Sequence, residues 1–256
     1  MRPNIVKTKL AAGELVFGTM IFEFLSPGLP RILANSGADF VFYDLEHSGF
    51  TIEDMKTQFA LCAGAGVIPF ARPPGKDYQY TARLLDVGAF GLLYQMVESA
   101  EEARELVRWS RYPPEGIRGA IFGGAHDDYS GGDMAQKADA AMERTFTTVL
   151  IETRAGLENI DEILAVEGID AAHLGHADMS LSLGIPGQFD HPDLQRAIDT
   201  IAETAAKNGK VAATLAPTPE WGHDFINRGY RMLSYSYDIG LMTDGLTAGI
   251  NALKAG

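Results

Sequence analysis

The chain has 256 residues, and 46% of them are apolar, so it can form a sizeable core and is neither disordered nor collagen-like. Its 34 acidic residues outnumber its 21 Lys and Arg, and the resulting net charge of −13 excludes a nucleic-acid binder with a basic face. The single Cys62 excludes an intrachain disulfide and a cysteine-based zinc site, and without a signal-peptide pattern or an apolar run of about 18 residues we expect a cytoplasmic protein that does not cross a membrane.

Short apolar runs alternate with longer amphipathic stretches along the whole chain. The apolar runs predict strands at Val16–Met20, Asp39–Asp44, Val67–Arg72, Ala89–Met96, Thr147–Glu152, Ile169–Gly175, Lys210–Leu215 and Arg231–Tyr235. The amphipathic stretches predict helices at Ser26–Ser36, Thr51–Ala65, Asp77–Val87, Ser99–Arg111, Thr153–Ala165, His191–Asn208, Thr218–Asn227 and Ile239–Ala255.

Eight strand signals, each followed by a helix, predict an α/β fold, a (β/α)₈ TIM barrel that occupies residues 1–256 as one domain. The alternative is an open doubly wound sheet. That fold usually has fewer strands and a glycine-rich phosphate loop after the first strand, and this sequence has no such loop. The one long connection, 112–144, is of a length that is usually functional or carries its own short helix.

Reactive side chains gather where the predicted strands end, which is where (β/α)₈ barrels carry their chemistry. These positions are Asp44-Leu45-Glu46-His47, Arg72, Gln95-Met96, Glu152 and Gly175-His176-Ala177-Asp178. We therefore expect carboxylates, an arginine and a histidine to meet at one rim of the barrel.

Two of these carboxylates, Glu152 and Asp178, follow neighbouring strands and predict a Mg²⁺ or Mn²⁺ site completed by water and substrate. Such an ion binds a 2-keto acid and stabilises the enolate formed from it. The alternative is that each carboxylate caps the helix that follows it. His176 is a candidate third ligand, which would favour Mn²⁺, Co²⁺ or Zn²⁺ instead.

Arg72 is a candidate for binding a carboxylate or an oxyanion, and a structural ion pair with Asp44 or Glu46 is the alternative. His47 is the candidate general acid or base, oriented by Asp44 or by Asp86 at the end of the third helix. His173 is expected to pack in the core. His126 is expected to be solvated, with the alternative that its place in the long loop lets it reach the pocket. Only Lys76 lies near this rim, so a metal site is favoured over a lysine imine.

Taken in order, these motifs resemble the HpcH/HpaI aldolase family over nearly the whole chain. The matching segments are Asp44-Leu45-Glu46-His47, Arg72-Pro73, Leu85-Asp86-Val87-Gly88-Ala89, Tyr112–Gly119, Ile151-Glu152-Thr153 and Gly175–Ser180. The resemblance implies a class II, divalent-metal-dependent (Mg²⁺, Mn²⁺ or Co²⁺) 2-keto-acid aldolase without an organic cofactor. It also implies a modified (β/α)₈ barrel in a hexamer, a trimer of dimers, with the last helix exchanged between subunits.

Residue by residue, the resemblance implies Glu152 and Asp178 as metal ligands and Arg72 as the group that holds the pyruvate enolate. It implies His47 as the acid/base residue, supported by Asp44 and Asp86. The backbone of Gly175, His176 and Ala177 is then expected to face the substrate carboxylate.

Three positions depart from the family pattern. His176 replaces a proline, Leu150 replaces a glutamine, and Gln95 precedes Met96 where a proline is usual. We expect His176 and Gln95 to contact substrate, and we expect the reversible cleavage of a 4-hydroxy-2-keto acid to an aldehyde and pyruvate or a more polar donor such as hydroxypyruvate. The alternatives are a metal-dependent keto-acid decarboxylase of the oxaloacetate type, an acyl-CoA lyase, and a non-catalytic keto-acid sensor.

Overall fold

A closed barrel of eight parallel strands, in the order β1 to β8, forms the centre of the molecule, and β8 pairs with β1 to complete the circle. This computed structural model describes residues 1–255, so Gly256, the last residue of the predicted domain, lies outside them. The strands are β1 Val16–Ile21, β2 Phe40–Asp44, β3 Ile68–Arg72, β4 Gly91–Tyr94, β5 Phe146–Ile151, β6 Ala171–Leu174, β7 Val211–Ala216 and β8 Met232–Tyr237. The predicted (β/α)₈ barrel is therefore confirmed.

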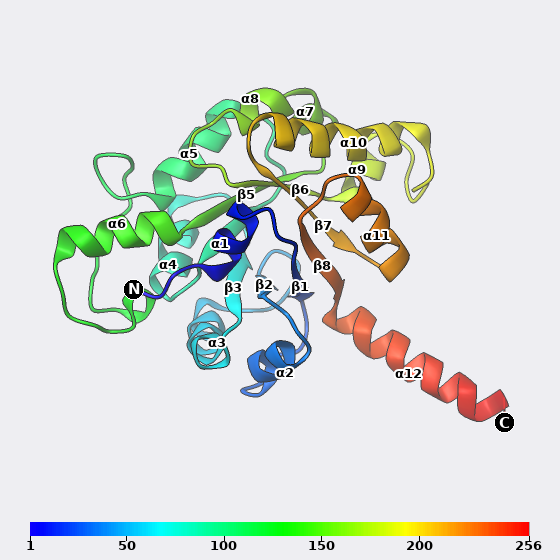
Figure 1. Ribbon diagram of the computed structural model, residues 1–256, viewed down its shortest axis with the longest axis horizontal. Coiled ribbons are helices and arrows are strands. Elements are labelled where there is room, and N and C mark those ends of the chain that lie inside the picture. Colours follow the sequence, from blue (N-terminus) through cyan, green and yellow to red (C-terminus); the bar gives the residue numbers. More distant parts are fainter. Residues whose placement is uncertain (256) are drawn as a thin grey trace.

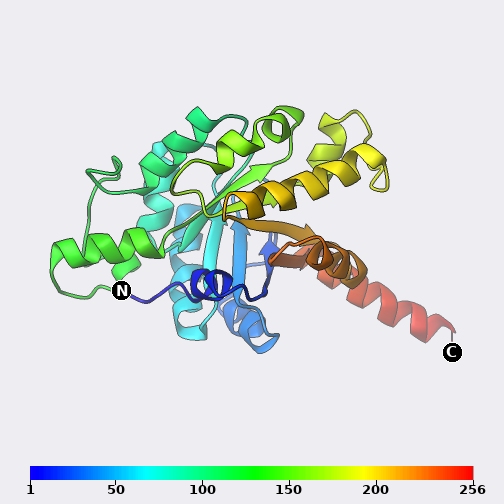
Figure 2. The ribbon, with the colours of Figure 1, turned by 45° about the horizontal axis from the view of Figure 1, so that its top comes forward.

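Helices surround the barrel, and each strand runs into at least one of them (Figures 1 and 2). They are α1 Ile5–Ala11, α2 Leu29–Asn35, α3 Ile52–Ala65, α4 Tyr78–Asp86, α5 Ala100–Ser110, α6 Met134–Arg144, α7 Arg154–Glu158, α8 Ile160–Leu164, α9 His176–Ser182, α10 Pro192–Lys207, α11 Pro219–Asn227 and α12 Asp238–Ala255. A short 3₁₀ turn, η1, covers Ala125–Asp127.

The structure differs from the sequence-based expectation in its extra helices. The long connection between β4 and β5 carries η1 and α6, and the single helix expected over 153–165 is divided into α7 and α8 at Asn159. The short helices α1 and α9 were not predicted, because each spans only 7 residues and gives little periodicity.

Side-chain caps fix several helix starts. Thr51 and Asp54 form a capping box at α3, with each side chain accepting from the backbone N–H of the other residue. Asp77 and Ser99 cap α4 and α5 by accepting from backbone N–H groups three residues on. Because a cap fixes where a helix begins, it also fixes the length of the loop that leads from the preceding strand.

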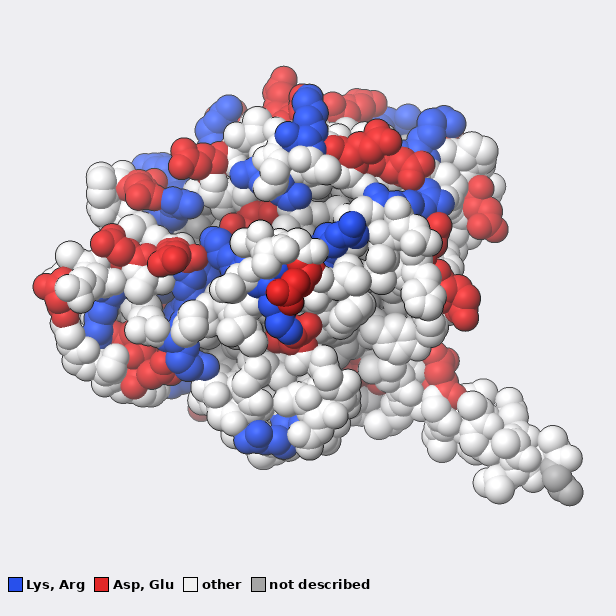
Figure 3. All heavy atoms as spheres, viewed as in Figure 1, with Lys and Arg blue, Asp and Glu red and all other residues white. Residues whose placement is uncertain are grey.

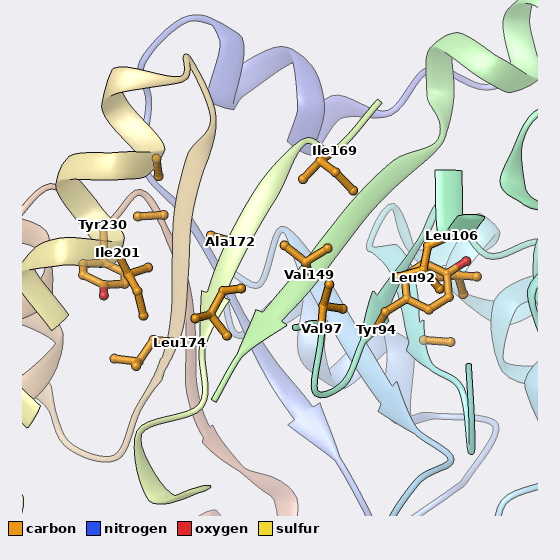
Figure 4. Close-up of a cluster of buried hydrophobic side chains, with 14 of the residues drawn as sticks. Leu92, Tyr94, Val97, Leu106, Val149, Ile169, Ala172, Leu174, Ile201 and Tyr230 are labelled. Carbon is orange, nitrogen blue, oxygen red and sulfur yellow. The ribbon is translucent and has the colours of Figure 1, made fainter. Parts of the chain in front are cut away.

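Two apolar clusters hold the layers together. One fills the barrel with phenylalanine rings from adjacent strands, and the other lies between the barrel and its helices. In the second cluster, Val149 and Leu174 of the strands pack toward Ile201 of α10 (Figure 4). Because protein interiors are close-packed, these layers keep the strand ends at fixed relative positions.

Helix α12 points away from the barrel (Figures 1 and 2). None of its described residues is buried, although it carries large apolar side chains at Leu241, Met242, Leu246, Ile250 and Leu253. The face visible in Figure 3 is largely uncharged along this helix. Within residues 1–255, no helix is both long enough and apolar enough to cross a membrane.

Candidate active site

A cavity of about 390 Å³ opens at the carboxyl ends of the strands. Predicted site residues that line it are His47, Arg72, Glu152, Gly175, His176, Ala177 and Asp178. They come from β2, β3, β5 and β6 or from the loops that follow, as the strand-end argument predicts. Larger hollows elsewhere on the molecule lie near the amino-terminal ends of the strands and contain none of these groups.

Arg72 is held by two carboxylates. Its Nε and Nη2 donate to the two oxygens of Asp44 over 2.9 and 2.6 Å, and its Nη1 lies 3.1 Å from Oε2 of Glu46. Burial by itself would lower the pKa of Arg72, but the hydrogen bond and charge of Asp44 raise it above its ordinary value. The guanidinium therefore stays charged, and N–H groups on Nη1 and Nη2 remain for a substrate oxygen.

The carboxylate of Asp44 is fully engaged within the chain. Both of its oxygens are engaged by Arg72, and Oδ1 also accepts from the Glu46 backbone N–H. Within the chain, Asp44 is thus the hydrogen-bonding partner of Arg72. The ion pair that the sequence offered as an alternative is present, and it involves both Asp44 and Glu46.

Glu152 lies on the cavity wall with one oxygen occupied. Its Oε1 accepts from the backbone N–H of Met96 over 2.8 Å. Met96 has a φ of 49°, an unusual value for a residue with a side chain, and Lys76 Nζ donates to its carbonyl over 2.6 Å. The strained loop after β4 thus presents its amide to Glu152, a contact that no side-chain pattern in the sequence could indicate.

Burial raises the pKa of Glu152 to about 7, and the nearby negative charge of Asp178 contributes to the increase. The Met96 N–H and the charge of Arg72 oppose it. Burial likewise raises the pKa of Glu46, against the positive charges of Arg72 and His47. Among the described residues, the carboxyl groups of Glu23, Glu152 and Asp178 line the cavity beside one arginine, Arg72, and in their charged forms they favour the entry of a positive ion.

Gly175 lies directly against Glu152. A Cβ at this position would be 2.6 Å from Glu152 Oε2, much closer than a real contact allows. Only glycine leaves this carboxylate oxygen free to turn into the cavity. The glycine at the end of β6 thus has a specific steric role in the site.

His176 begins α9 and forms part of an aromatic group with Phe189 and Trp221, at ring-centroid distances of 5.5 and 5.2 Å. Burial lowers the pKa of its imidazole, so the ring is neutral near pH 7. Among the described residues, no group of three or more His, Cys, Asp or Glu is arranged to hold an ion, so His176 does not complete a three-ligand protein site. Its position is on the cavity wall.

Two predicted site residues lie elsewhere in the chain. Asp86 is the last residue of α4, which runs back toward the amino-terminal end of the barrel, and its carboxylate pairs with Arg118 over 2.7 Å. Gln95 is buried, donates to the Pro73 carbonyl over 3.0 Å and is not among the residues that line the cavity. Within one chain, Asp86 cannot orient His47, and Gln95 supports the loop after β3.

Two further histidines, His173 and His126, are both buried. His173 is buried in the barrel interior beside Phe42, as expected of a packed core residue. His126 was expected to be solvated, and this is wrong: it is 1% exposed in η1, where its backbone carbonyl accepts from Arg144. The long connection folds back on the barrel and encloses it.

A lysine imine finds no support at this site. The described residues that line the cavity include no lysine. Lys76 lies near the rim, but its Nζ is engaged by the Met96 carbonyl and by the Glu102 carboxylate. A barrel rim that places Glu152 and Asp178 near an arginine held by two carboxylates instead defines a lyase site for anionic, oxygen-rich substrates.

Comparison with known proteins identifies the family. The model of the HpcH/HpaI aldolase/citrate lyase family matches residues 20–244, so the chain belongs to this family. The 2-keto-3-deoxy-L-rhamnonate aldolase of Escherichia coli K12 is 34% identical over 260 aligned positions, which cover 99% of this chain and 94% of that protein. The hydroxypyruvate/pyruvate aldolase of Roseobacter denitrificans is 35% identical and covers 93% of each chain.

Solved structures agree with the fold. The HpcH/HpaI aldolase from Desulfitobacterium hafniense superimposes with a TM-score of 0.93 at 33% identity, and the match covers 97% of this chain and 96% of that one. The chain is therefore a keto-acid aldolase, a carbon–carbon lyase. The class II aldolases of this family generally depend on a divalent metal ion.

Proposed function

We propose that this aldolase uses a divalent metal ion to cleave a 4-hydroxy-2-keto acid reversibly to an aldehyde and to pyruvate or a pyruvate-like acid such as hydroxypyruvate. The observation that supports it best is the cavity in which the clamped Arg72 faces Glu152 and Asp178. Relatives with about the same length and with 34–35% identity are named for a 2-keto-3-deoxy sugar acid and for hydroxypyruvate and pyruvate.

The residues present fit a divalent ion. Glu152 and Asp178 both line the cavity, and the missing side chain at Gly175 leaves Glu152 Oε2 unobstructed. Two carboxylates leave the remaining positions for water and for keto-acid oxygens, which suits Mg²⁺, Mn²⁺ or Co²⁺. When bound, the ion supplies Lewis-acid stabilisation of negative charge on a 2-keto acid.

The protein groups have complementary roles in this proposal. Arg72 binds the oxygen that becomes negative as the C3–C4 bond breaks, and its charge is secured by Asp44. His47 receives the proton of the 4-hydroxyl group. The backbone N–H groups of His176 and Ala177 at the start of α9 face the substrate carboxylate, since the first amides of a helix have no partner within it.

The test is cleavage of 4-hydroxy-2-oxopentanoate to pyruvate and acetaldehyde. We expect activity with Mg²⁺, Mn²⁺ or Co²⁺, its loss in excess chelator, and its return when the ion is restored. Glu152→Gln and Asp178→Asn should each weaken metal binding measured by calorimetry. Full activity in excess chelator would contradict the metal requirement, and an inactive enzyme across a panel of such acids would contradict the reaction.

The exposed apolar side of α12 supports a second part of the proposal. A monomer rarely leaves such a helix without a partner, because apolar surface in water is unfavourable. We infer a homo-oligomer, a hexamer built as a trimer of dimers, in which α12 packs on a neighbouring subunit. Light scattering coupled to size-exclusion chromatography measures this assembly directly.

A further inference from the structure

The acidic group next to His47 is Glu46, the residue that precedes it in the loop after β2. Local hydrogen bonds hold the backbone of this loop in place. Leu45 N–H donates to the Arg72 carbonyl over 2.9 Å, Glu46 N–H donates to Asp44 Oδ1 over 2.8 Å, and the Ser48 hydroxyl bonds the Asp44 carbonyl. The backbone from which the Glu46 side chain projects is thus held by a tight, hydrogen-bonded turn.

One oxygen of Glu46 lies between two functional groups. Its Oε2 is 3.1 Å from Arg72 Nη1 and 3.5 Å from His47 Nε2. This atom is buried, and among the described residues no donor meets it with the geometry of a regular hydrogen bond. A buried carboxylate oxygen is costly to leave without a donor, so it is available to His47 when that ring moves or becomes protonated.

The two acids expected beside His47, Asp44 and Asp86, bind other groups within the chain. Asp44 uses both oxygens on Arg72, and Asp86 pairs with Arg118. Glu152 Oε1 accepts from Met96 on another strand. Among residues 1–255, Glu46 is therefore the carboxylate that contacts His47.

We propose that Glu46 is a positioning residue for His47, and this inference rests on the proposed aldol cleavage. Its carboxylate accepts from Nε2–H of the imidazole, which leaves the lone pair on Nδ1 to take the proton of the 4-hydroxyl group. As the O–H bond breaks, its electron pair forms the aldehyde carbonyl and the C3–C4 pair passes to the enolate. The imidazolium that results is stabilised by Glu46 until it returns the proton.

The same contact joins His47 to Arg72. Because Oε2 lies near both His47 Nε2 and Arg72 Nη1, Glu46 keeps the proton-accepting group and the charge-stabilising group at a fixed separation. Loss of the carboxylate is then expected to lower the turnover number more than it raises KM. If Glu46 served only to hold Arg72, its removal would lower the turnover number by the same factor with His47 present or absent.

A double-mutant cycle on the full-length, metal-loaded enzyme tests this coupling, with 4-hydroxy-2-oxopentanoate as the probe. We expect Glu46→Gln to lower kcat by about 10- to 100-fold, in line with the loss of an orienting partner, and Glu46→Asp to recover part of this. In a His47→Asn background, the same Glu46→Gln change should lower kcat by less than about 3-fold. Glu105→Gln, an exposed glutamate on α5, serves as the control and should match the wild type.

The outcomes separate the two levels of the proposal. An equal loss from Glu46→Gln in both backgrounds, or a Glu46→Gln enzyme with wild-type kcat, overturns the positioning role while the aldolase function stands. If Glu46→Gln does not fold, Glu46→Asp provides the same cycle, and equal effects in the two backgrounds again overturn it. A wild-type enzyme that cleaves no 4-hydroxy-2-keto acid overturns the proposed function itself.

Discussion

Asp44 and Arg72 are register partners at the carboxyl ends of β2 and β3, and their side chains are joined by two hydrogen bonds of 2.9 and 2.6 Å. Both side chains are buried, Asp44 completely. The geometry of the sheet thus determines which carboxylate holds the arginine. Because the barrel fixes the adjacent backbones, this ion pair is preorganised in the absence of substrate.

Removal of Asp44 should destabilise the protein strongly. Asp44→Ala leaves the buried guanidinium with only Glu46, and breaking a buried ion pair on one side costs about 3–5 kcal/mol. We expect a loss of this size in the free energy of unfolding measured with urea, together with loss of cleavage. Glu105→Ala, which breaks the exposed pair with Arg108, should cost less than about 1 kcal/mol. Equal effects of the two changes would show that the pair at Arg72 is not a special stabilising element.

Gly175→Ala tests the contact between β6 and Glu152. The added methyl group would lie 2.6 Å from Glu152 Oε2 and must displace it. We expect at least a tenfold weaker binding of Mn²⁺ by calorimetry, as found when the surroundings of metal ligands are disturbed. Gly64→Ala on α3 is the matched control, because nothing lies within 4 Å of its added Cβ. Unchanged affinity in Gly175→Ala would remove Glu152 from the metal site.

His173 makes stability depend on pH. Burial lowers its pKa to about 3, whereas in the unfolded chain its pKa is about 6.5. Between these values the unfolded state binds more protons, so stability is complete above about pH 6.5 and falls by up to about 5 kcal/mol as the pH drops toward 3. In His173→Phe, the free energy of unfolding, measured with urea at pH 7, 6, 5 and 4, should fall less steeply as the pH decreases. The same slope in the variant and the wild type would assign the acid sensitivity to other groups.

The apolar side of α12 should carry the self-association. Leu246 is 62% exposed in the single chain, so Leu246→Asp should leave the barrel folded and shift the protein to smaller species in light scattering. The driving force lost is the burial of an apolar side chain, about 1.5–3 kcal/mol at each copy. Gln136→Asp, on exposed surface of α6, adds the same charge and should leave the assembly unchanged. An intact assembly in Leu246→Asp would place the interface elsewhere.

Sequence patterns were sufficient to predict the barrel and to bring three residues of the site together. Strand ends in a (β/α)₈ barrel converge by topology, so Arg72, Glu152 and Asp178 could be grouped without coordinates. The pairing of Asp44 with Arg72 depended on register, and the sequence left two partners open. Pattern alone could not show that a strained Met96 would offer its amide to Glu152.

The surroundings of Asp86 and His126 could not be predicted for a common physical reason. Asp86 and His126 were assessed by their position in the chain, while their surroundings come from Arg118 and Arg144 in the long connection, which folds onto the amino-terminal half of the barrel. Irregular segments carry no periodicity, so their return to the barrel has no signal in a single sequence. The contact of Gln95 could not be predicted for a related reason, since its partner is a loop carbonyl, that of Pro73.

Metal-dependent enolisation is the central claim, and exchange of the pyruvate methyl protons in D₂O measures it directly by NMR. We predict exchange with the wild-type enzyme and Mg²⁺ or Mn²⁺, none in excess chelator, and a strong reduction in Glu152→Gln and Arg72→Ala. A protein that only senses keto acids would bind pyruvate without exchange. Exchange that persists in chelator, or none at all with the metal-loaded enzyme, would contradict the account.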